Sequence, residues 1–161
     1  MPCTWPGETP LYRAYHDEEW GVPLTDGRDL FAKLLLDGFQ AGLAWITILR
    51  KRDGFYDAFE GFDPERLAGY GDDDVARLMG DARIGRNRAK INAAITNAQA
   101  WLDIEAAGDG AFAELLWSTV DGKMLVNQHG ALREIQAETD ESRAMSKALR
   151  ARGFKFEIGR A

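Results

Sequence analysis

The chain has 161 residues, of which 45% are hydrophobic and 29% charged, a composition typical of one soluble globular domain. No apolar run approaches the roughly 18 residues that a transmembrane helix needs, so a membrane span is excluded and no membrane partner is expected. The net charge of -6 argues against a protein that holds nucleic acid by charge alone. Basic residues nevertheless gather between Arg143 and Arg160, where any contact with nucleic acid is expected.

The N-terminus and the cysteine content indicate where the protein resides. The first residues lack the basic region and the apolar stretch of a secretory signal. The single cysteine, Cys3, has no partner for an internal disulfide. Both observations predict a cytoplasmic protein. No repeat and no low-complexity linker divides the sequence, so residues 1–161 are expected to form a single domain.

The first half of the chain carries apolar residues at helical spacing. An amphipathic stripe predicts a helix over residues 28–39, with Asp26 placed as its N-cap. A second apolar face begins at Trp45, and Gly54 is expected to interrupt it.

Two short helices are predicted next. Asp63 and Pro64 have the residue types of an N-cap and a first helical position, and Gly69 is expected to end this helix. Residues 72–79 repeat the pattern.

The second half of the chain contains the clearest helix, over residues 86–106, where apolar residues recur at spacings of four, three and four. Another short helix is expected over residues 112–116. Thr139 or Asp140 caps a last one, which Gly153 closes. Residues 123–127 alone could pass for a strand. The sequence therefore predicts an all-α fold of about seven helices.

Cys3 and His16 have side chains that suit zinc, since a thiolate and an imidazole are common zinc ligands. A structural zinc site needs four ligands, and the only other histidine is His129. The alternative is a free thiol and a histidine that is hydrogen-bonded to a carboxylate such as Asp17.

Aromatic residues are concentrated in the first third of the chain. Such residues are usually part of the core, but rings beside polar residues also suit a slot that stacks a planar ligand, such as a base flipped out of DNA. The candidates are Trp5, Tyr12, Tyr15, Trp20 and Trp45.

Asp37 is a carboxylate at the end of an otherwise apolar helix. It is either a solvated acid on the outer face or a partly desolvated acceptor that faces a cavity between helices. Gly38 and Gly42 would let the backbone turn tightly around such a cavity.

The C-terminal residues 153–156 follow a basic helix and carry the sequence GFKF. This segment has the features of a hairpin between two helices, whose backbone N–H groups would bind a DNA phosphate. The alternative is a simple helix C-cap. Candidate DNA-binding residues are Lys147, Arg150, Gly153 and Lys155.

Four segments carry a resemblance, and the first two are highly diagnostic: residues 10–23 (PLYRAYHDEEWGVP), 38–47 (GFQAGLAWIT), 84–91 (IGRNRAKI) and 146–156 (SKALRARGFKF). Together they resemble the DNA-3-methyladenine glycosylase I family, a zinc-containing branch of the helix-hairpin-helix DNA glycosylases. The resemblance implies a monomeric repair enzyme that excises 3-methyladenine, swung out of alkylated double-stranded DNA.

The resemblance also implies roles for individual residues. Tyr15 and Asp37 lie where the family has the tyrosine and glutamate that hydrogen-bond the methylated adenine, and Trp45 lies where it stacks a tryptophan on the base. Asp37 is thus the candidate catalytic residue. Trp5, Tyr12 and Trp20 are further candidates for base binding. Cys3 and His16 match two of the family's four ligands to a structural zinc.

Two features depart from the family pattern. Asp37 is shorter than glutamate by one carbon–carbon bond, about 1.5 Å, so a water-mediated contact to the base is expected. The family continues past Phe156 into the second hairpin helix and the other two zinc ligands, whereas this sequence ends at Ala161. A truncated chain with weak DNA affinity and poor excision is therefore expected. A module that binds a modified purine without cleaving, and a helical interaction protein whose aromatics are all core, stay open as alternatives.

Overall fold

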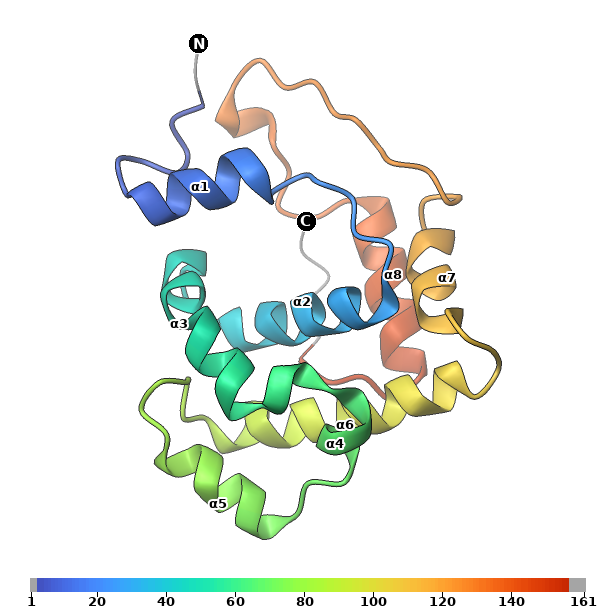
Figure 1. The fold of residues 1–161 in the computed structure, drawn as a ribbon. Helices are drawn as coiled ribbons and strands as arrows, with labels where there is room; N and C mark the ends of the chain where they lie inside the picture. Colours follow the sequence, from blue (N-terminus) through green and yellow to red (C-terminus); the bar gives the residue numbers. More distant parts are fainter. Residues whose placement is uncertain (1–2, 157–161) are drawn as a thin grey trace.

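The computed structural model describes residues 3–156, which form eight α-helices and two short 3-10 helices, with no strand in that range (Figure 1). The α-helices are α1 (Pro10–Glu18), α2 (Gly27–Gln40), α3 (Trp45–Ala58), α4 (Pro64–Ala68), α5 (Asp72–Gly80), α6 (Arg88–Glu105), α7 (Ala111–Ser118) and α8 (Asp140–Ala151), and the 3-10 helices are η1 (Glu60–Phe62) and η2 (Leu132–Glu134). The predicted all-α class is confirmed. Within residues 3–156, no helix is both long and apolar enough to cross a membrane.

A core rich in phenylalanine holds the helices together. Helix α6 is the longest and packs against α2, α4, α5 and α7, while α3 crosses the end of α2 (Figure 1). Phe39 of α2 lies 4.7 Å from Phe55 of α3, measured between ring centroids. Aromatic rings at this separation bury large apolar areas and fix the angle between helices. The phenylalanines with 2% exposure or less are Phe31, Phe39, Phe55, Phe59, Phe62, Phe112 and Phe154.

Side-chain caps begin the main helices where the sequence predicted them. Asp26 accepts hydrogen bonds from the backbone N–H groups of Arg28 and Asp29 at 2.9 and 3.0 Å. Asp63 caps α4 by accepting a hydrogen bond from the backbone N–H of Arg66. Thr139 caps α8 by accepting one from the backbone N–H of Ser142. Each cap satisfies N–H groups that have no partner inside the helix. These local signals explain why the helix starts were predictable.

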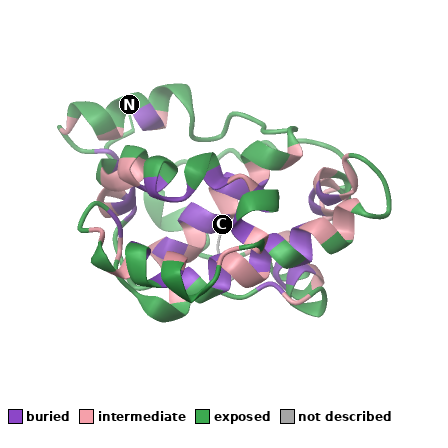
Figure 2. Cartoon of the chain, turned by 60° about the horizontal axis from the view of Figure 1, so that its bottom comes forward, coloured by how far each residue is buried: buried purple, intermediate pink, exposed green. Residues whose placement is uncertain are grey.

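Helix α1 is absent from the sequence prediction. Figure 2 shows it as exposed along most of its length, and Tyr15 is its only buried residue. The helix has only nine residues, so the helical spacing of Leu11, Tyr12 and Tyr15 is a short signal. Pro10 at its first turn was a second local signal that could have revealed it.

Gly54 does not interrupt the second helix, contrary to the sequence prediction, because α3 continues to Ala58. A Cβ atom at position 54 would lie 2.7 Å from the Cβ of Arg83 and 3.0 Å from its carbonyl oxygen. Gly54 is therefore a site of close packing rather than a helix end.

Residues 123–127, the candidate strand, are an exposed segment without regular structure in which Val126 is 71% exposed. They have no neighbouring strand to pair with among residues 3–156. The residues after Phe156, where the hairpin was expected to end, lie outside the described part of the chain.

Candidate functional site

Helices α1 and α3 bring two aromatic residues of the predicted site together. The rings of Tyr15 and Trp45 are 5.5 Å apart between centroids and inclined at 48°. Both side chains are buried, with 7% and 8% exposure. The indole N–H of Trp45 is buried and has no hydrogen-bond partner among the described residues. Buried polar groups are nearly always paired, so a donor of this kind suits a position beside a ligand or water.

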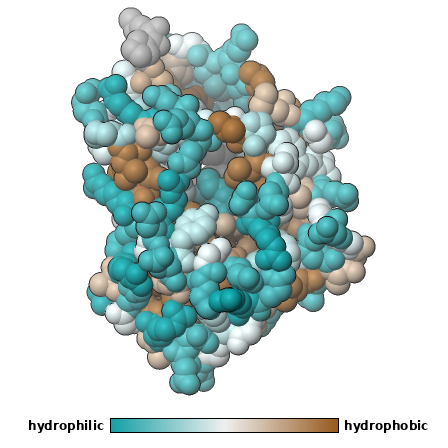
Figure 3. All heavy atoms as spheres, viewed as in Figure 1, coloured by the Kyte–Doolittle hydropathy of each residue, from teal (hydrophilic) through white to brown (hydrophobic). Residues whose placement is uncertain are grey.

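Asp37 lies on the last turn of α2. Its side chain keeps 38% of its surface exposed, yet burial raises the pKa of its carboxyl, while the charge of Lys33 and a hydrogen bond from Lys33 act in the opposite direction. On the face that Figure 3 shows, small groups of hydrophobic side chains lie among mostly hydrophilic ones. Because its carboxyl is partly exposed and also partly desolvated, Asp37 fits the partly desolvated acceptor better than a fully solvated acid.

Electrostatics link Tyr15 to Asp37. Burial, and then the negative charge of Asp37, raise the pKa of Tyr15 to about 12. The phenol therefore stays protonated at neutral pH and can donate a hydrogen bond. The three residues singled out for the base, Tyr15, Asp37 and Trp45, thus surround one place from three helices.

Lys33 is a member of the site that the sequence analysis missed. Its ammonium lies 2.5 Å from Oδ1 of Asp37 and 4.5 Å from the centroid of the Trp45 ring. The ammonium is therefore both ion-paired and placed over an aromatic face, which attracts cations. The spacing of four residues between Lys33 and Asp37 was the available signal, but such pairs also occur on ordinary helix surfaces.

Lys90 of α6 fixes the turn that carries the site. Its ammonium donates hydrogen bonds to the backbone carbonyls of Phe39 and Ala41 at 2.8 and 2.6 Å. These carbonyls end α2, where a positive charge is favourable. Gly42 follows with a positive φ of 81°, which lets the chain reverse into α3 and place Trp45 at its first position.

The other predicted aromatics form a second group on the outer side of α1. Trp5 lies 4.8 Å from Tyr12 and 5.2 Å from Trp20 between ring centroids, and the ring of His16 stacks on Trp20 at 5.4 Å. Trp5 and Trp20 are 38% and 49% exposed, unlike the Tyr15–Trp45 pair. The structure therefore divides the five aromatic candidates into a buried pair and a second cluster, in which Trp5 and Trp20 are exposed and Tyr12 is half-buried.

The two predicted zinc ligands lie near this cluster. Cys3 is exposed, and Nδ1 of His16 is 2.8 Å from a carboxylate oxygen of Asp17. The hydrogen bond to Asp17 was the alternative expected from the sequence, and it leaves Nε2 of His16 available. Residues 3–156 contain no group of three or more His, Cys, Asp or Glu side chains placed to hold a metal ion. These residues fit a zinc site in kind but not in number.

The C-terminal segment differs from the prediction in its backbone. The N–H of Gly153 donates to the carbonyl of Arg150, and that of Phe154 to the carbonyl of Leu149. The N–H of Lys155 donates to the side chain of Asn97 at 2.7 Å. These N–H groups close α8 and fasten the segment to α6, so they are not directed at a phosphate. In the described residues the segment is thus closed as the alternative of a helix C-cap has it, and contact of Gly153 with a phosphate stays a prediction.

The side chains of this region remain candidates for DNA contact. Lys147 and Arg150 are exposed residues of α8, and Lys155 is exposed in the segment that follows this helix. Gly153 has a positive φ of 92°, which ends α8.

Two hollows elsewhere in the molecule are separate from the predicted base site. A groove between α6 and α7 and a small cavity between α2 and α6 include none of Tyr15, Asp37 and Trp45.

A planar cation is the kind of ligand that this site suits. The ring of Trp45, the phenol of Tyr15 and the carboxylate of Asp37 come from three helices. The ammonium of Lys33 already contacts both the ring and the carboxylate. Proteins that read an alkylated base taken out of the DNA stack need these features. The site thus has the side chains that suit a positively charged aromatic group.

Comparison with known proteins identifies the family. The methyladenine glycosylase family model matches residues 5–160, and the chain belongs to this family, whose members hydrolyse N-glycosidic bonds. The chain is 49% identical over 154 residues to DNA-3-methyladenine glycosylase 1 of Escherichia coli K12, covering 96% of this chain and 82% of that protein.

Solved structures of the family share the fold. A crystal structure of 3-methyladenine DNA glycosylase I matches with a TM-score of 0.93 and 49% identity, covering 97% of this chain and 85% of the other. A structure of the Staphylococcus aureus enzyme, determined to explain recognition of 3-methyladenine, matches with a TM-score of 0.91 and 39% identity, covering 96% and 81% of the two chains.

Proposed function

We propose that this chain excises 3-methyladenine from alkylated double-stranded DNA by hydrolysing the bond between the base and the sugar. The observation that carries the proposal is the convergence of Tyr15, Asp37 and Trp45 from three helices. The ammonium of Lys33 already contacts both the ring and the carboxylate there. The names of the relatives support the same lesion.

The chemistry of the lesion matches these side chains. Methylation at N3 makes the purine cationic and a good leaving group, so little acid catalysis is needed. Trp45 offers a π-face to the cation and Asp37 a negative charge at its edge, both of which favour it over neutral adenine. Tyr15 stays protonated and donates a hydrogen bond to the base. Selectivity and rate then follow from binding the charged, flipped nucleotide.

The reaction balances without a redox partner. The oxygen of a water molecule bonds to C1′ of the sugar as the bond from C1′ to N9 of the base breaks. The electron pair of that bond stays on the purine and cancels its positive charge, and one proton of the water passes to solvent. The products are neutral 3-methyladenine and DNA with an abasic site.

Base release from methylated duplex DNA tests the proposal. We expect the chain to release 3-methyladenine, and Asp37→Asn to release it at least about a hundredfold more slowly, the scale on which loss of one preorganised electrostatic contact acts. Lys123→Gln, on the exposed loop after α7, is a control whose activity should equal that of the unaltered chain. Binding of 3-methyladenine without release would instead support a purine-binding module, and neither binding nor release would leave only an interaction protein.

Zinc is a separate part of the proposal. Cys3 and His16 supply two donors, and the bond from Asp17 to Nδ1 of His16 is the kind of support that metal-binding histidines usually have. A tetrahedral site needs two more ligands, and outside residues 3–156 this sequence offers only the side chain of Glu157. No step of base release depends on this metal. Elemental analysis of the purified protein tests this part: zinc that is retained by the unaltered protein and lost in Cys3→Ala would support it, and a metal-free protein would contradict it.

Contacts to DNA are proposed for the basic side chains of α8 and of the segment that follows it. Lys147, Arg150 and Lys155 are placed to meet phosphates, in a helix-hairpin-helix arrangement that the family resemblance supports. Trp5 and Trp20 are exposed and Trp5 contacts the half-buried Tyr12, an aromatic surface that suits contact with the flipped nucleotide or its neighbours. We further propose that the protein acts as a monomer in the cytoplasm, where bacterial DNA lies.

A further inference from the structure

We propose that Lys33 is a resident cation of the base-binding site, which covers Trp45 and Asp37 in the free protein, is expelled by the cationic lesion and returns to help release the neutral product. The inference rests on the proposed function, because it names what the incoming base must displace.

One ammonium makes both contacts that the lesion is expected to make. The Nζ atom of Lys33 lies 4.5 Å from the Trp45 ring centroid and 2.5 Å from the Asp37 carboxylate. A cationic purine stacked on the same ring, with its edge at the same carboxylate, would meet a like charge there. Two unit charges cannot share one ring face and one anion without strong repulsion. The lysine must therefore leave before the base can enter.

The lysine is able to leave at small cost. Its side chain is 36% exposed and that of Asp37 is 38% exposed, so solvent already reaches the ion pair. Exposed pairs of this kind contribute little to stability, and the four-carbon stem of lysine lets the ammonium swing into water. Lys33 is also a single turn of α2 away from Asp37, so it can return without movement of the backbone.

The reaction itself changes how well the base competes with this lysine. Before the glycosidic bond breaks, the purine is a cation and replaces the ammonium charge for charge at Asp37. After the bond breaks, the product is neutral and leaves the negative charge of the carboxylate without a partner. The ammonium of Lys33 then competes more effectively, because a cation binds both the ring and the carboxylate more strongly than a neutral base does. Lys33 thus favours exchange of product for solvent.

The charged groups around Asp37 on neighbouring helices leave Lys33 as its cationic partner. On α1, Tyr15 is a neutral phenol and Glu19 is paired with Arg52 of α3 at 2.6 Å. Lys33 on α2 forms the ion pair of Asp37. Lys90 of α6 is bonded to the carbonyls that end α2.

Substitution by methionine tests the inference, because Met keeps the length and the helical preference of Lys but removes the charge. Binding of 3-methyladenine is measured by tryptophan fluorescence and by product inhibition of base release. We expect Lys33→Met to lower Kd and the inhibition constant by about fivefold, the scale of one displaced cation–π contact. Lys33→Arg keeps a cation over the ring and should not tighten binding.

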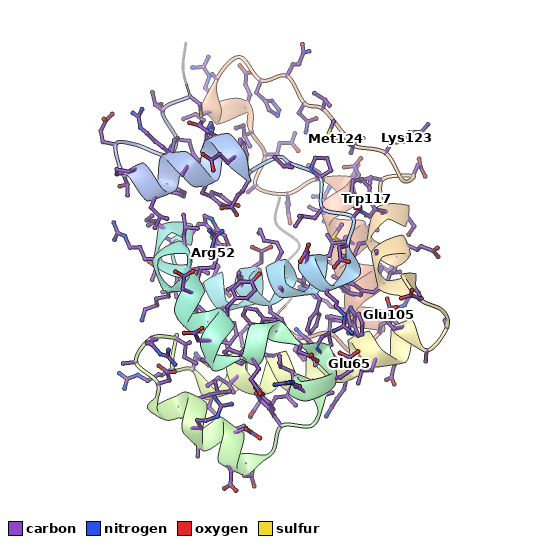
Figure 4. All side chains as sticks on the ribbon, in the orientation of Figure 1. Arg52, Glu65, Glu105, Trp117, Lys123 and Met124 are labelled. Atoms are coloured by element: carbon purple, nitrogen blue, oxygen red, sulfur yellow. The ribbon has the colours of Figure 1, made fainter. Side chains whose placement is uncertain are left out.

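The matched control is Lys123→Met, which makes the same change of charge on the exposed loop after α7, where Figure 4 labels the residue. It should leave Kd unaltered. A labelling experiment gives a second readout: acetylation of Lys33, followed by mass spectrometry, should rise when 3-methyladenine is added, and acetylation of Lys123 should not.

The possible failures are distinguishable. If the unaltered chain releases 3-methyladenine and Lys33→Met binds it no more tightly than Lys123→Met does, the role of Lys33 is refuted and the proposed function stands. If the unaltered chain and all variants neither bind nor release the base, the proposed function fails and this inference fails with it.

Discussion

Three residues of the site have properties that the same side chains would not have on an open surface. The carboxyl of Asp37 has its pKa raised by burial, the phenol of Tyr15 has its pKa raised to about 12, and the indole N–H of Trp45 has no partner among the described residues. Each is a cost to the fold, and such costs are typical of sites kept for binding. Because these three residues lie close together, substitutions of each of them test the proposed function directly.

Asp37 should give the reaction an acidic limb. Its pKa lies above the ordinary 3.8, because burial outweighs the opposing effect of Lys33. As the pH falls through this raised pKa, the carboxylate is protonated and its attraction for the cationic base is lost. We expect kcat/KM to fall with a midpoint above 3.8, and Asp37→Asn to remove the limb. A pH profile of both proteins measures this, and identical limbs would contradict it.

The raised pKa of Asp37 also predicts that the substitution Asp37→Asn stabilises the fold at neutral pH. A carboxyl whose pKa is raised by folding contributes stability below its unfolded pKa, and this contribution is lost as the pH rises through the folded pKa. At neutral pH the ionised Asp37 therefore weakens the fold. Asp37→Asn should raise the free energy of unfolding at pH 7 and change it little at pH 3. Urea unfolding at both pH values tests this, and a loss of stability at pH 7 would disprove it.

Tyr15 should separate binding from folding. Tyr15→Phe keeps the ring that anchors α1 but removes the phenol donor, so we expect kcat/KM for base release to fall by about tenfold, the scale of one hydrogen bond. The melting temperature should change little, since the phenol makes no hydrogen bond that the substitution would leave unpaired in residues 3–156. Kinetics and thermal melting of the same preparation measure both. Equal kinetics for both proteins would remove Tyr15 from the site.

Among the helices, a polar side chain of α6 holds the segment that follows α8 in position. Asn97 on α6 is buried and binds Lys155 twice, with Nδ2 donating to the carbonyl at 3.0 Å and Oδ1 accepting from the N–H at 2.7 Å. This pair fastens the end of α8 to the longest helix, and Phe154 beside it stacks on Phe112. The basic residues of α8 are therefore held in a fixed position relative to the core.

Asn97→Ala should loosen this attachment. The substitution leaves the backbone N–H and carbonyl of Lys155 without their partner, which costs about 2 kcal/mol in unfolding free energy. Asn92→Ala, an exposed asparagine on the same helix, is the matched control and should cost much less. Denaturant titrations of the two variants compare them. Equal losses would show that the Asn97 contacts contribute nothing.

The elements also show what a sequence can and cannot predict. Helix α2 was predictable because its apolar stripe and its Asp26 cap are both local. Helix α1 was not, since it buries only Tyr15, and the role of Gly54 depends on Arg83, which is distant in sequence. Family resemblance brought Tyr15, Asp37 and Trp45 together as a hypothesis. Lys33 could not be found in this way, because its contact with Trp45 exists only after α2 and α3 have packed.

At the scale of the whole molecule, charge is distributed unevenly. The chain carries 26 acidic and 20 basic residues, yet the helix α8 presents exposed cations on one side of the bundle. An acidic protein can bind DNA only through such a local surface. The basic side of α8 is therefore the part of the described surface where the proposed contacts with phosphates are expected.

Salt dependence should reveal that surface. Log affinity falls linearly with log salt concentration, and each phosphate contact adds about 0.9 to the magnitude of this slope. Lys147→Gln should therefore lower the slope by about one, whereas Arg66→Gln on α4 should leave it unchanged. Fluorescence anisotropy of a labelled duplex at several salt concentrations gives both slopes. An unchanged slope for Lys147→Gln would place the phosphate contacts elsewhere.

The single buried residue of α1 has a consequence for dynamics. Because this helix is attached to the rest of the protein mainly through Tyr15 and the Glu19–Arg52 pair, it forms a separate unit of low local stability, able to open while the phenylalanine core stays folded. Its amide protons should exchange with deuterium well before those of α6. One half of the recognition site would then melt and re-form many times during the life of each folded molecule, admitting bulky nucleotides without global unfolding.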